Sequence, residues 1–340
     1  MSDLGKYLEA ELDNETIAQI QAKVLHITHQ YNMGKALFPR TLLEDLNRQI
    51  DQHCDEIQVP DFDDIPRTYS LKVPGWCADF ANTYRINYRS IHDLSTPTPV
   101  CPELVLRNDH CPVSIGYTRT SALTDSTLDE VHSAFLAKRH LWTTTSTYHD
   151  LVHHLSTLPL STPISKIVCF GLGPMGRLES YHTARAHVQH AAVETMAAVL
   201  AARGATAGRK IECFAQDPAY DAVDVELLRR IGIVVLDDPK GFLEVDEETL
   251  VFSVSPNVPV KQIVVDGRWP AAMVWNTVMP AEKDRKQWVK IMEKNGDETW
   301  TSPFTTDPDS RRVRKMIMQY AQAQLHDPHE YLGDLTIYTK

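Results

Sequence analysis

The stretch KIVCFGLGPMG, at residues 166–176, decides the fold of this 340-residue chain. Its four apolar residues, 167–170, run without a polar interruption and are followed by the first of three glycines. Four similar runs come later in the chain, at residues 211–215, 233–236, 250–254 and 272–275. A continuous apolar run indicates a strand that is buried on both faces, as strands of a parallel sheet are. The sequence therefore predicts five parallel strands.

Helical patterns separate these strands. Residues 184–203 carry an apolar stripe that ends before Gly204, and residues 221–231 begin at the capping residue Asp221 and end before Gly232. Because crossovers between parallel strands are right-handed, such helices cover the sheet on both sides. We predict an α/β fold for residues 161–280, a Rossmann-like open parallel sheet with helices on both faces.

The flanking segments are predicted from weaker patterns. Residues 1–160 are expected to form a mainly helical and irregular region that packs on the core, with no topology assigned to the proline-rich stretch 59–120. Residues 281–340 are expected to add helices that complete the sheet domain. The expected helices cover residues 4–29, 41–54, 283–294 and 311–324, and two more begin near Asp125 and Thr147.

Composition excludes several classes of protein. No apolar run approaches the ~20 residues that span a bilayer, and the acidic start MSDLGKYLEAELDNE does not resemble a targeting signal. The net charge of -11 argues against non-specific coating of nucleic acid. The six cysteines form no C-x-x-C pair, which favours free thiols. We therefore expect a cytoplasmic protein that binds neither membrane nor DNA.

The glycines at Gly171, Gly173 and Gly176 match G-x-G-x-x-G, but the context of a dinucleotide site is incomplete. Pro174 removes a backbone donor, and Asp217 follows far beyond the ~20 residues expected for a ribose-binding carboxylate. We interpret the loop as a tight turn that lets a substrate approach the backbone, and we expect no nicotinamide or flavin cofactor.

Other cofactor and metal motifs are absent or incomplete. His149 and His153 lie four residues apart, but no third ligand is evident, so we interpret them as surface or packing histidines and expect no metal. The chain has no phosphate loop for ATP and no G-x-S-x-G turn.

Polar residues follow each predicted strand, where an open parallel sheet binds its ligands. Each of them alone could simply cap a helix or close a turn, and together they favour a binding site. In strand order they are Gly171 and Gly173, Gln216 and Asp217, Asp237 and Asp238, Ser255 and Asn257, and Asn276 and Thr277.

Residues 164–279 resemble the sensitivity-to-red-light-reduced domain. The resemblance is carried by KIVCFGLGPMG, by ECFAQDPAYDAVDVELLRRIGIVVLDD, by VFSVSPN and by AMVWNTV. The first half of the chain, with its proline-rich middle, is similar to the fungal branch of that family, in which some members are arginine-containing cyclodipeptide synthases. Those enzymes take arginine and a second amino acid from aminoacyl-tRNAs and close a diketopiperazine. The founding members of the family are linked to light and circadian signalling.

The resemblance implies that the partners are arginyl-tRNA and a second aminoacyl-tRNA. Arginine's guanidinium requires carboxylates, a role open to Asp237 with Asp238, or to Asp217. A general base for the α-amino group would be Asp217 or His182. Backbone N–H groups of the turn from Gly171 to Gly173 are candidates for stabilising the oxyanion.

Further roles complete the expected site. Bacterial cyclodipeptide synthases use a serine after the first strand, which this chain lacks. Either Ser255 or Ser180 forms an acyl-enzyme, or the two substrates react directly. Asn257 and Asn276 are expected to bind substrate.

The basic stretch Arg311, Arg312, Arg314 and Lys315 is either a solvated helix face or the tRNA contact.

Two other functions remain open. One is a non-catalytic regulatory or signalling protein whose crevice binds a metabolite or a partner, and the other is a methyltransferase-like enzyme that uses S-adenosylmethionine. The second amino acid, the nucleophile and the oligomeric state are not specified by the sequence.

Overall fold

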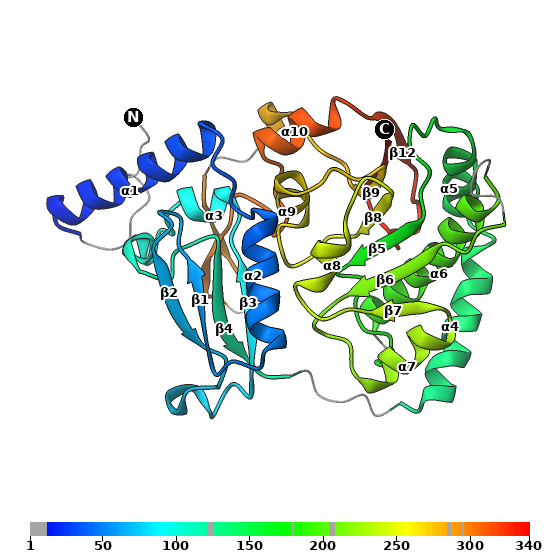
Figure 1. The fold of residues 1–340 in the computed structure, drawn as a ribbon, viewed down its shortest axis with the longest axis horizontal. Coiled ribbons are helices and arrows are strands. Elements are labelled where there is room, and N and C mark those ends of the chain that lie inside the picture. Colours follow the sequence, from blue (N-terminus) through cyan, green and yellow to red (C-terminus); the bar gives the residue numbers. More distant parts are fainter. Residues whose placement is uncertain (1–11, 121–125, 179, 204–207, 284–286, 294–295) are drawn as a thin grey trace.

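The computed structural model describes residues 12–120, 126–178, 180–203, 208–283, 287–293 and 296–340. Figure 1 shows two parts side by side, an N-terminal unit of residues 14–118 and a larger domain built on a central sheet. Among the described residues, no helix combines the length and the apolar composition that a membrane crossing requires.

The central sheet has seven strands, five of them parallel neighbours. The five predicted strands are confirmed, and two C-terminal strands extend the sheet in antiparallel pairing. In spatial order the strands are β7 (Ile233–Val235), β6 (Glu212–Gln216), β5 (Lys166–Phe170), β8 (Thr249–Ser253), β9 (Ala272–Asn276), β13 (Leu335–Thr339) and β12 (Ala321–Leu325). The predicted α/β fold with a mostly parallel sheet is therefore correct.

Helices cover both faces of this sheet, as predicted. Alternate residues of β5 point to opposite sides: Ile167 and Cys169 pack in one apolar core, and Val168 and Phe170 pack in the other. The first core contains α4 (Leu128–Trp142), α5 (Ser146–Thr157), α6 (Tyr181–Ala201) and α7 (Ala222–Arg230). The second contains α8 (Lys240–Glu244), α9 (Val260–Asp266), α10 (Arg311–Ile317) and much of the N-terminal unit.

The N-terminal unit is less helical than predicted. Two antiparallel strand pairs occupy most of the stretch to which no topology was assigned, and buried residues alternate with more exposed ones in the first strand of the first pair and in the second half of the first strand of the other pair. Its elements are α1 (Asn14–Asn32), α2 (Arg40–Asp51), β1 (Glu56–Pro60), β2 (Pro66–Ser70), η2 (Gly75–Cys77), β3 (Thr83–Tyr88), α3 (Ile91–Ser95), η3 (Pro102–Leu106) and β4 (Val113–Thr118). The predicted helix start at residue 4 and the signals at Asp125 and Gly204 lie outside the described residues.

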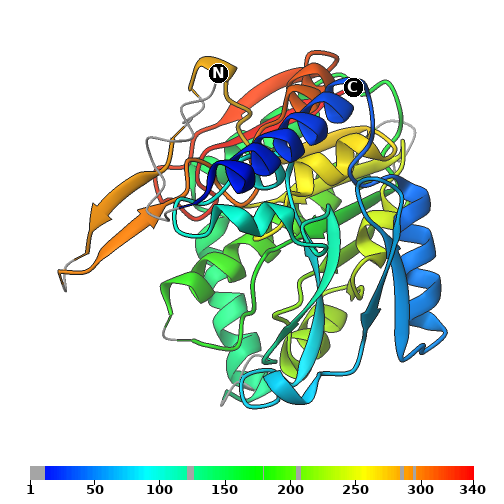
Figure 2. The same cartoon turned by 90° about the vertical axis from the view of Figure 1, so that its left-hand side faces the viewer.

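The prediction of C-terminal helices is largely wrong. Among the described residues of this segment, α10 is the one α-helix, and it ends at Ile317 because residues 321–325 pair with β13 instead. Residues 281–283 form a 3-10 turn, η5 (Ala281–Lys283), and β10 (Val289–Met292) and β11 (Glu298–Thr301) form a hairpin. Figure 2 shows this hairpin projecting from the body. Tertiary pairing overrides the helical propensity of these segments.

Arg312 joins the N-terminal unit to the sheet domain. Its guanidinium forms an ion pair with the buried Asp266 at 2.8 Å, donates to the carbonyl oxygens of Tyr31 and Lys35, and stacks 3.9 Å from the Tyr31 ring. Asp266 also accepts the backbone N–H of Leu37. This cluster therefore fixes the turn between α1 and α2 against α9.

Replacing Arg312 by Ala should lower the free energy of unfolding by roughly 3 kcal/mol, because it leaves Asp266 buried without its cation. Arg311 is exposed at the neighbouring position, so Arg311→Ala is the matched control and should change stability by less than ~0.5 kcal/mol. Denaturant titration measures both. Equal stabilities of the two variants would contradict the role assigned to Arg312.

Candidate functional site

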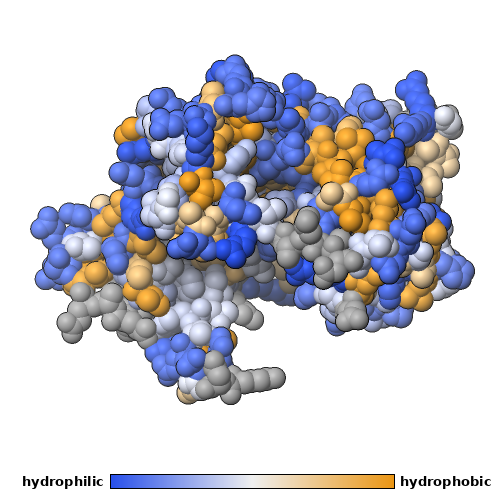
Figure 3. Space-filling model, turned by 90° about the horizontal axis from the view of Figure 1, so that it is seen from below, coloured by the Kyte–Doolittle hydropathy of each residue, from blue (hydrophilic) through white to orange (hydrophobic). Residues whose placement is uncertain are grey.

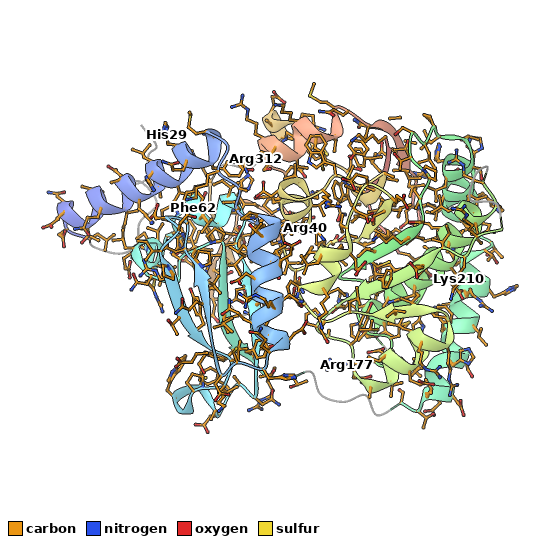
Figure 4. The ribbon with its side chains drawn as sticks, viewed as in Figure 1. His29, Arg40, Phe62, Arg177, Lys210 and Arg312 are labelled. Carbon is orange, nitrogen blue, oxygen red and sulfur yellow. The ribbon has the colours of Figure 1, made fainter. Side chains whose placement is uncertain are left out.

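The carboxyl ends of the five parallel strands face the N-terminal unit. In Figure 4, Arg177, which follows β5, lies toward that unit, and Lys210, which precedes β6, lies at the far end of the sheet. Figure 3 shows that the molecular surface is hollowed between the two parts on the face seen from below. The expected binding edge is thus enclosed by a second unit.

The predicted residues share this edge but do not share one pocket. Neighbouring strands lie about 4.8 Å apart, so the outer positions of five strands are separated by roughly 19 Å. The strand order places Asp237 and Asp238 at one end, Asp217 and Gly171 in the middle, and Ser255 and Asn276 toward the other end. Three adjacent regions result.

The central region is the glycine loop, residues 171–176, and its N–H groups are used within the protein. Gly171 N–H donates to the Gln216 carbonyl at 3.2 Å, and Gly173 N–H donates to Asp217 Oδ2 at 2.8 Å. The predicted oxyanion contact with these two groups is therefore wrong for the loop as it is folded. Such a contact would require both hydrogen bonds to break.

Asp217 anchors this loop. Its second oxygen accepts the N–H of Ala219 at 2.9 Å, so both carboxylate oxygens are occupied by backbone donors. Burial raises the pKa of Asp217, against the lowering effect of these two hydrogen bonds. The geometry fits a positioning residue beneath the loop better than the predicted base or guanidinium ligand.

Gly171 has a packing role. Its φ is +68°, and a Cβ there would lie 3.0 Å from Pro256 Cβ and 3.1 Å from Pro256 Cα. Pro256 thus closes the gap between the ends of β5 and β8, which is the usual switch-point crevice of such sheets. The space available to a ligand lies instead on the α6 side of the loop.

A pocket of about 240 Å³ lies on that side, and we call it the glycine-loop pocket. It contains the predicted base His182 and the predicted alternative nucleophile Ser180, both near the start of α6. Its wall also includes the exposed cation Arg177, which the sequence did not single out. The full lining is Gly173, Pro174, Gly176, Arg177, Ser180, His182, Thr183, Ala219, Asp221 and Asp224.

Asp224 fixes the floor of this pocket. It is completely buried, and it accepts the N–H of Met175 at 2.8 Å and that of Asp221 at 3.1 Å. Burial raises the pKa of Asp224, while the hydrogen bonds from Met175 and Asp221 lower it. The capping box of α7 therefore also shapes the glycine loop.

The serine turn, residues 255–257, lies away from this pocket. Ser255 has an unusual φ of +47° for a residue other than glycine, and its N–H donates to Asn276 Oδ1 at 2.7 Å. Ser255 Oγ lies 3.4 Å from the same oxygen, and within the described chain it contacts no histidine or carboxylate. Asn276 thus closes the turn, while Asn257 is exposed beside it.

At the β7 end lies an acidic corner, formed by Asp237 and Asp238 with Tyr84 and Tyr88 of the N-terminal unit. Tyr88 Oη donates to Asp238 Oδ1 at 2.7 Å, and Gln216 Nε2 donates to the same oxygen at 3.0 Å. Burial raises the pKa of Asp238 to about 7, although both hydrogen bonds lower it. Asp237 is exposed beside it.

The corner carries more carboxylates than cations. Lys240 pairs with Asp51 at 2.8 Å, which raises the pKa of Lys240, and the charge of Asp237 also raises it. No ion pair reaches Asp237 or Asp238 from the part of the chain that the structure describes. Burial raises the pKa of Tyr84, and the charges of Asp237 and Asp238 raise it further. A bound cation would relieve this repulsion.

Sequence reasoning singled out Gln216 but missed Tyr84 and Tyr88. The alternation in TYRINY, residues 83–88, marks a strand that turns Tyr84, Ile86 and Tyr88 to one face, but it does not show which partner that face meets.

The four predicted RNA-binding cations do not form one free surface. Arg311 and Lys315 are exposed, Arg314 Nε donates to the Met279 carbonyl at 2.8 Å, and Arg312 holds Asp266. The structure thus gives Arg312 a structural role in place of the predicted RNA contact. In Figure 4, Arg312 lies near the top of the molecule and Arg177 lies near the bottom.

The histidine pair gains no support as a metal site. Among the described residues, no three His, Cys, Asp or Glu side chains form a group that could hold a metal ion. His149 and His153 lie on α5, where His149 contacts the Tyr148 ring and His153 contacts the His154 ring. All six cysteines are free.

Comparison with known proteins identifies the domain. The family model described as the SRR1 domain matches residues 144–337, which extends beyond the predicted resemblance to include α5 and most of β13. A search of curated proteins finds no similar sequence. A structure titled "DhpI-SAH complex structure" has 11% identity and a TM-score of 0.25, covering 63% of this chain and 96% of its own. A likeness of that strength says nothing about ligand or activity.

The buried carboxyl of Asp238 should make stability depend on pH. Its pKa in the folded state is about 7, above the ordinary value near 3.8, so folding favours the protonated form. The associated stability is present at low pH and is lost as pH rises through 7. We expect Asp238→Asn to become more stable relative to the wild type between pH 5 and about 8. A difference in unfolding free energy that is constant with pH would contradict this assignment.

Proposed function

The chain belongs to the SRR1 domain family, and from this premise we propose that it makes an arginine-containing cyclic dipeptide from aminoacyl-tRNAs. The observation that carries the proposal is the acidic corner, where Asp237 and Asp238 form no ion pair with any described residue at the carboxyl-terminal edge of the sheet. We also propose that the chain is one of the fungal synthases of this family and that it acts in the cytoplasm.

Arginine fits the acidic corner chemically. A guanidinium is planar, always charged and rich in donors, so it pairs well with carboxylates that are already held in place. Asp238 Oδ1 is fixed by Tyr88 and Gln216, which leaves its second oxygen and the exposed Asp237 to receive a cation. A guanidinium there would favour the ionised form of Asp238.

The glycine-loop pocket is proposed to hold the second aminoacyl group. At about 240 Å³ it is smaller than the roughly 300–1,000 Å³ of pockets that enclose drug-sized ligands, so it suits an amino-acid-sized group whose RNA remains outside.

In the proposed reaction, the α-amine of one aminoacyl group attacks the ester carbonyl of the other. The new C–N bond forms, the ester C–O bond breaks, and the ribose hydroxyl leaves with a proton. A second attack closes the ring and releases the second tRNA in the same way. The esters are already activated, so ATP is not needed, and His182 in the pocket is the proposed acceptor of the amine proton.

The structure also favours one nucleophile if an acyl-enzyme forms. Ser180 lies in the same pocket as His182, and its side chain does not cap α6. The hydrogen bonds of Ser255 go to Asn276. Ser180 is therefore the stronger candidate for acyl transfer.

The direct test supplies the purified chain with a pool of charged tRNAs and detects cyclic dipeptides by mass spectrometry. We expect a product that contains arginine. Asp237→Asn should raise KM for arginyl-tRNA by about tenfold or more, because a charge-assisted contact contributes roughly 1.5–3 kcal/mol. Asp64→Asn, at an exposed carboxylate in the N-terminal unit, is the control and should leave KM unchanged.

Two results would contradict the proposal. The absence of any cyclic product with every charged tRNA would favour the non-catalytic alternative, in which the crevice binds a regulatory metabolite or partner. An arginine product that forms equally well with Asp237→Asn would show that arginine binds elsewhere.

A further inference from the structure

An exposed aromatic cluster lies on the N-terminal unit and leads toward the acidic corner. Trp76 in η2 has 76% of its surface exposed, and Phe80 has 58% exposed. Their ring centroids are 6.2 Å apart, and Trp76 also contacts the Tyr117 ring edge-on at 6.3 Å. Large aromatic side chains are rarely exposed together without a binding role.

Tyr117 connects this cluster to the corner. It pairs with Tyr84 across the β3–β4 ladder, and directly opposed residues of an antiparallel pair place their side chains on the same face, about 5 Å apart. Tyr84 is in turn close enough to Asp237 and Asp238 to experience their charges. Phe80, Trp76, Tyr117 and Tyr84 thus form an aromatic row that ends at the proposed arginine site.

One exposed cation, Arg119, follows Tyr117 beside the row, and it forms no ion pair within the described ranges. Lys72 pairs with Asp55. Arg85 alternates with Tyr84 along β3 and therefore points to the opposite face of the strand. Arg119 donates to the Asp79 carbonyl, which holds the Trp76–Phe80 turn against β4.

We propose that this aromatic row is the platform on which the single-stranded 3′ end of the aminoacyl-tRNA stacks. The inference rests on the proposed function and specifies its RNA surface. Bases stack on exposed aromatic rings irrespective of sequence, and arginines beside them contact phosphates. An RNA end that is bound along the row would deliver its terminal aminoacyl group to Asp237 and Asp238.

This placement accounts for how an acidic protein holds RNA. The C-terminal basic helix α10 cannot present Arg312, which is committed to Asp266. The aromatic row requires few cations, because stacking provides much of the affinity for a single strand. The exposed cation Arg119 beside the exposed rings of Trp76 and Phe80 favours RNA over the apolar surface of another protein as the occupant.

The test measures binding of a short single-stranded RNA ending in CCA, the common 3′ end of tRNAs, to the full chain. The double variant Trp76→Ala, Phe80→Ala should weaken binding about tenfold or more. Trp76→Phe keeps a ring and should retain most of the affinity. Leu25→Ala removes an exposed apolar side chain on α1, far along the chain, and should have no effect.

Salt dependence provides a second readout. Arg119→Gln should reduce the slope of log affinity against log salt, because one phosphate contact is lost. Equal RNA affinities of the wild type and the double variant would overturn the platform. The platform would also be overturned if the double variant altered the oligomeric state in sedimentation and left the RNA affinity unchanged. The aromatic row would then be an interface between protein chains.

The two proposals fail differently. RNA binding that depends on Trp76 and Phe80 without any cyclic product would retain the platform and remove the synthase. A cyclic arginine product formed at the wild-type KM by the double variant would retain the synthase and remove the platform.

Discussion

The architecture of the candidate site depends on one hydrogen-bonded junction, in which Asp238 accepts from Tyr88 at 2.7 Å and from Gln216 at 3.0 Å. Gln216 also accepts the N–H of Gly241 at 2.7 Å, so a single amide side chain links β6, the turn after β7 and α8. A buried carboxyl is costly unless it is satisfied in this way. The junction attaches the N-terminal unit to the sheet at the carboxyl-terminal edge of the parallel strands, and it places two carboxyl groups there.

The glycine loop shows why a motif cannot be equated with a role. Three glycines after a buried strand indicate a loop that approaches a ligand, yet here the loop approaches Pro256 and donates its N–H groups to the protein itself. Asp217, a candidate base in the sequence, and Asp224, in the capping box of α7, instead accept hydrogen bonds from the loop. The pocket that could hold a substrate lies at the start of α6, where His182 and Ser180 are both part of its lining.

The sequence predicted the five parallel strands because continuous apolar runs that alternate with capped helices are typical of strands buried on both faces. It predicted the binding edge for the same reason. It failed where tertiary pairing decides: AQAQL at residues 321–325 resembles helix and forms an edge strand because LTIYT at residues 335–339 lies beside it. The partners of Asp238 could not be foreseen, since Tyr84 and Tyr88 come from a hairpin about 150 residues earlier whose docking depends on the whole fold. Likewise, nothing in the basic run RRVRK shows that Arg312 is committed to Asp266.

The central claim is that the acidic corner receives arginine. It is tested most directly by a crystal structure of the chain with arginine methyl ester, a minimal mimic of the arginyl ester on tRNA. The account predicts guanidinium nitrogens within hydrogen-bonding distance of Asp237 and Asp238, beside the Tyr84 ring. An ester bound at another surface, or a corner left without ligand at saturating concentration, would contradict it.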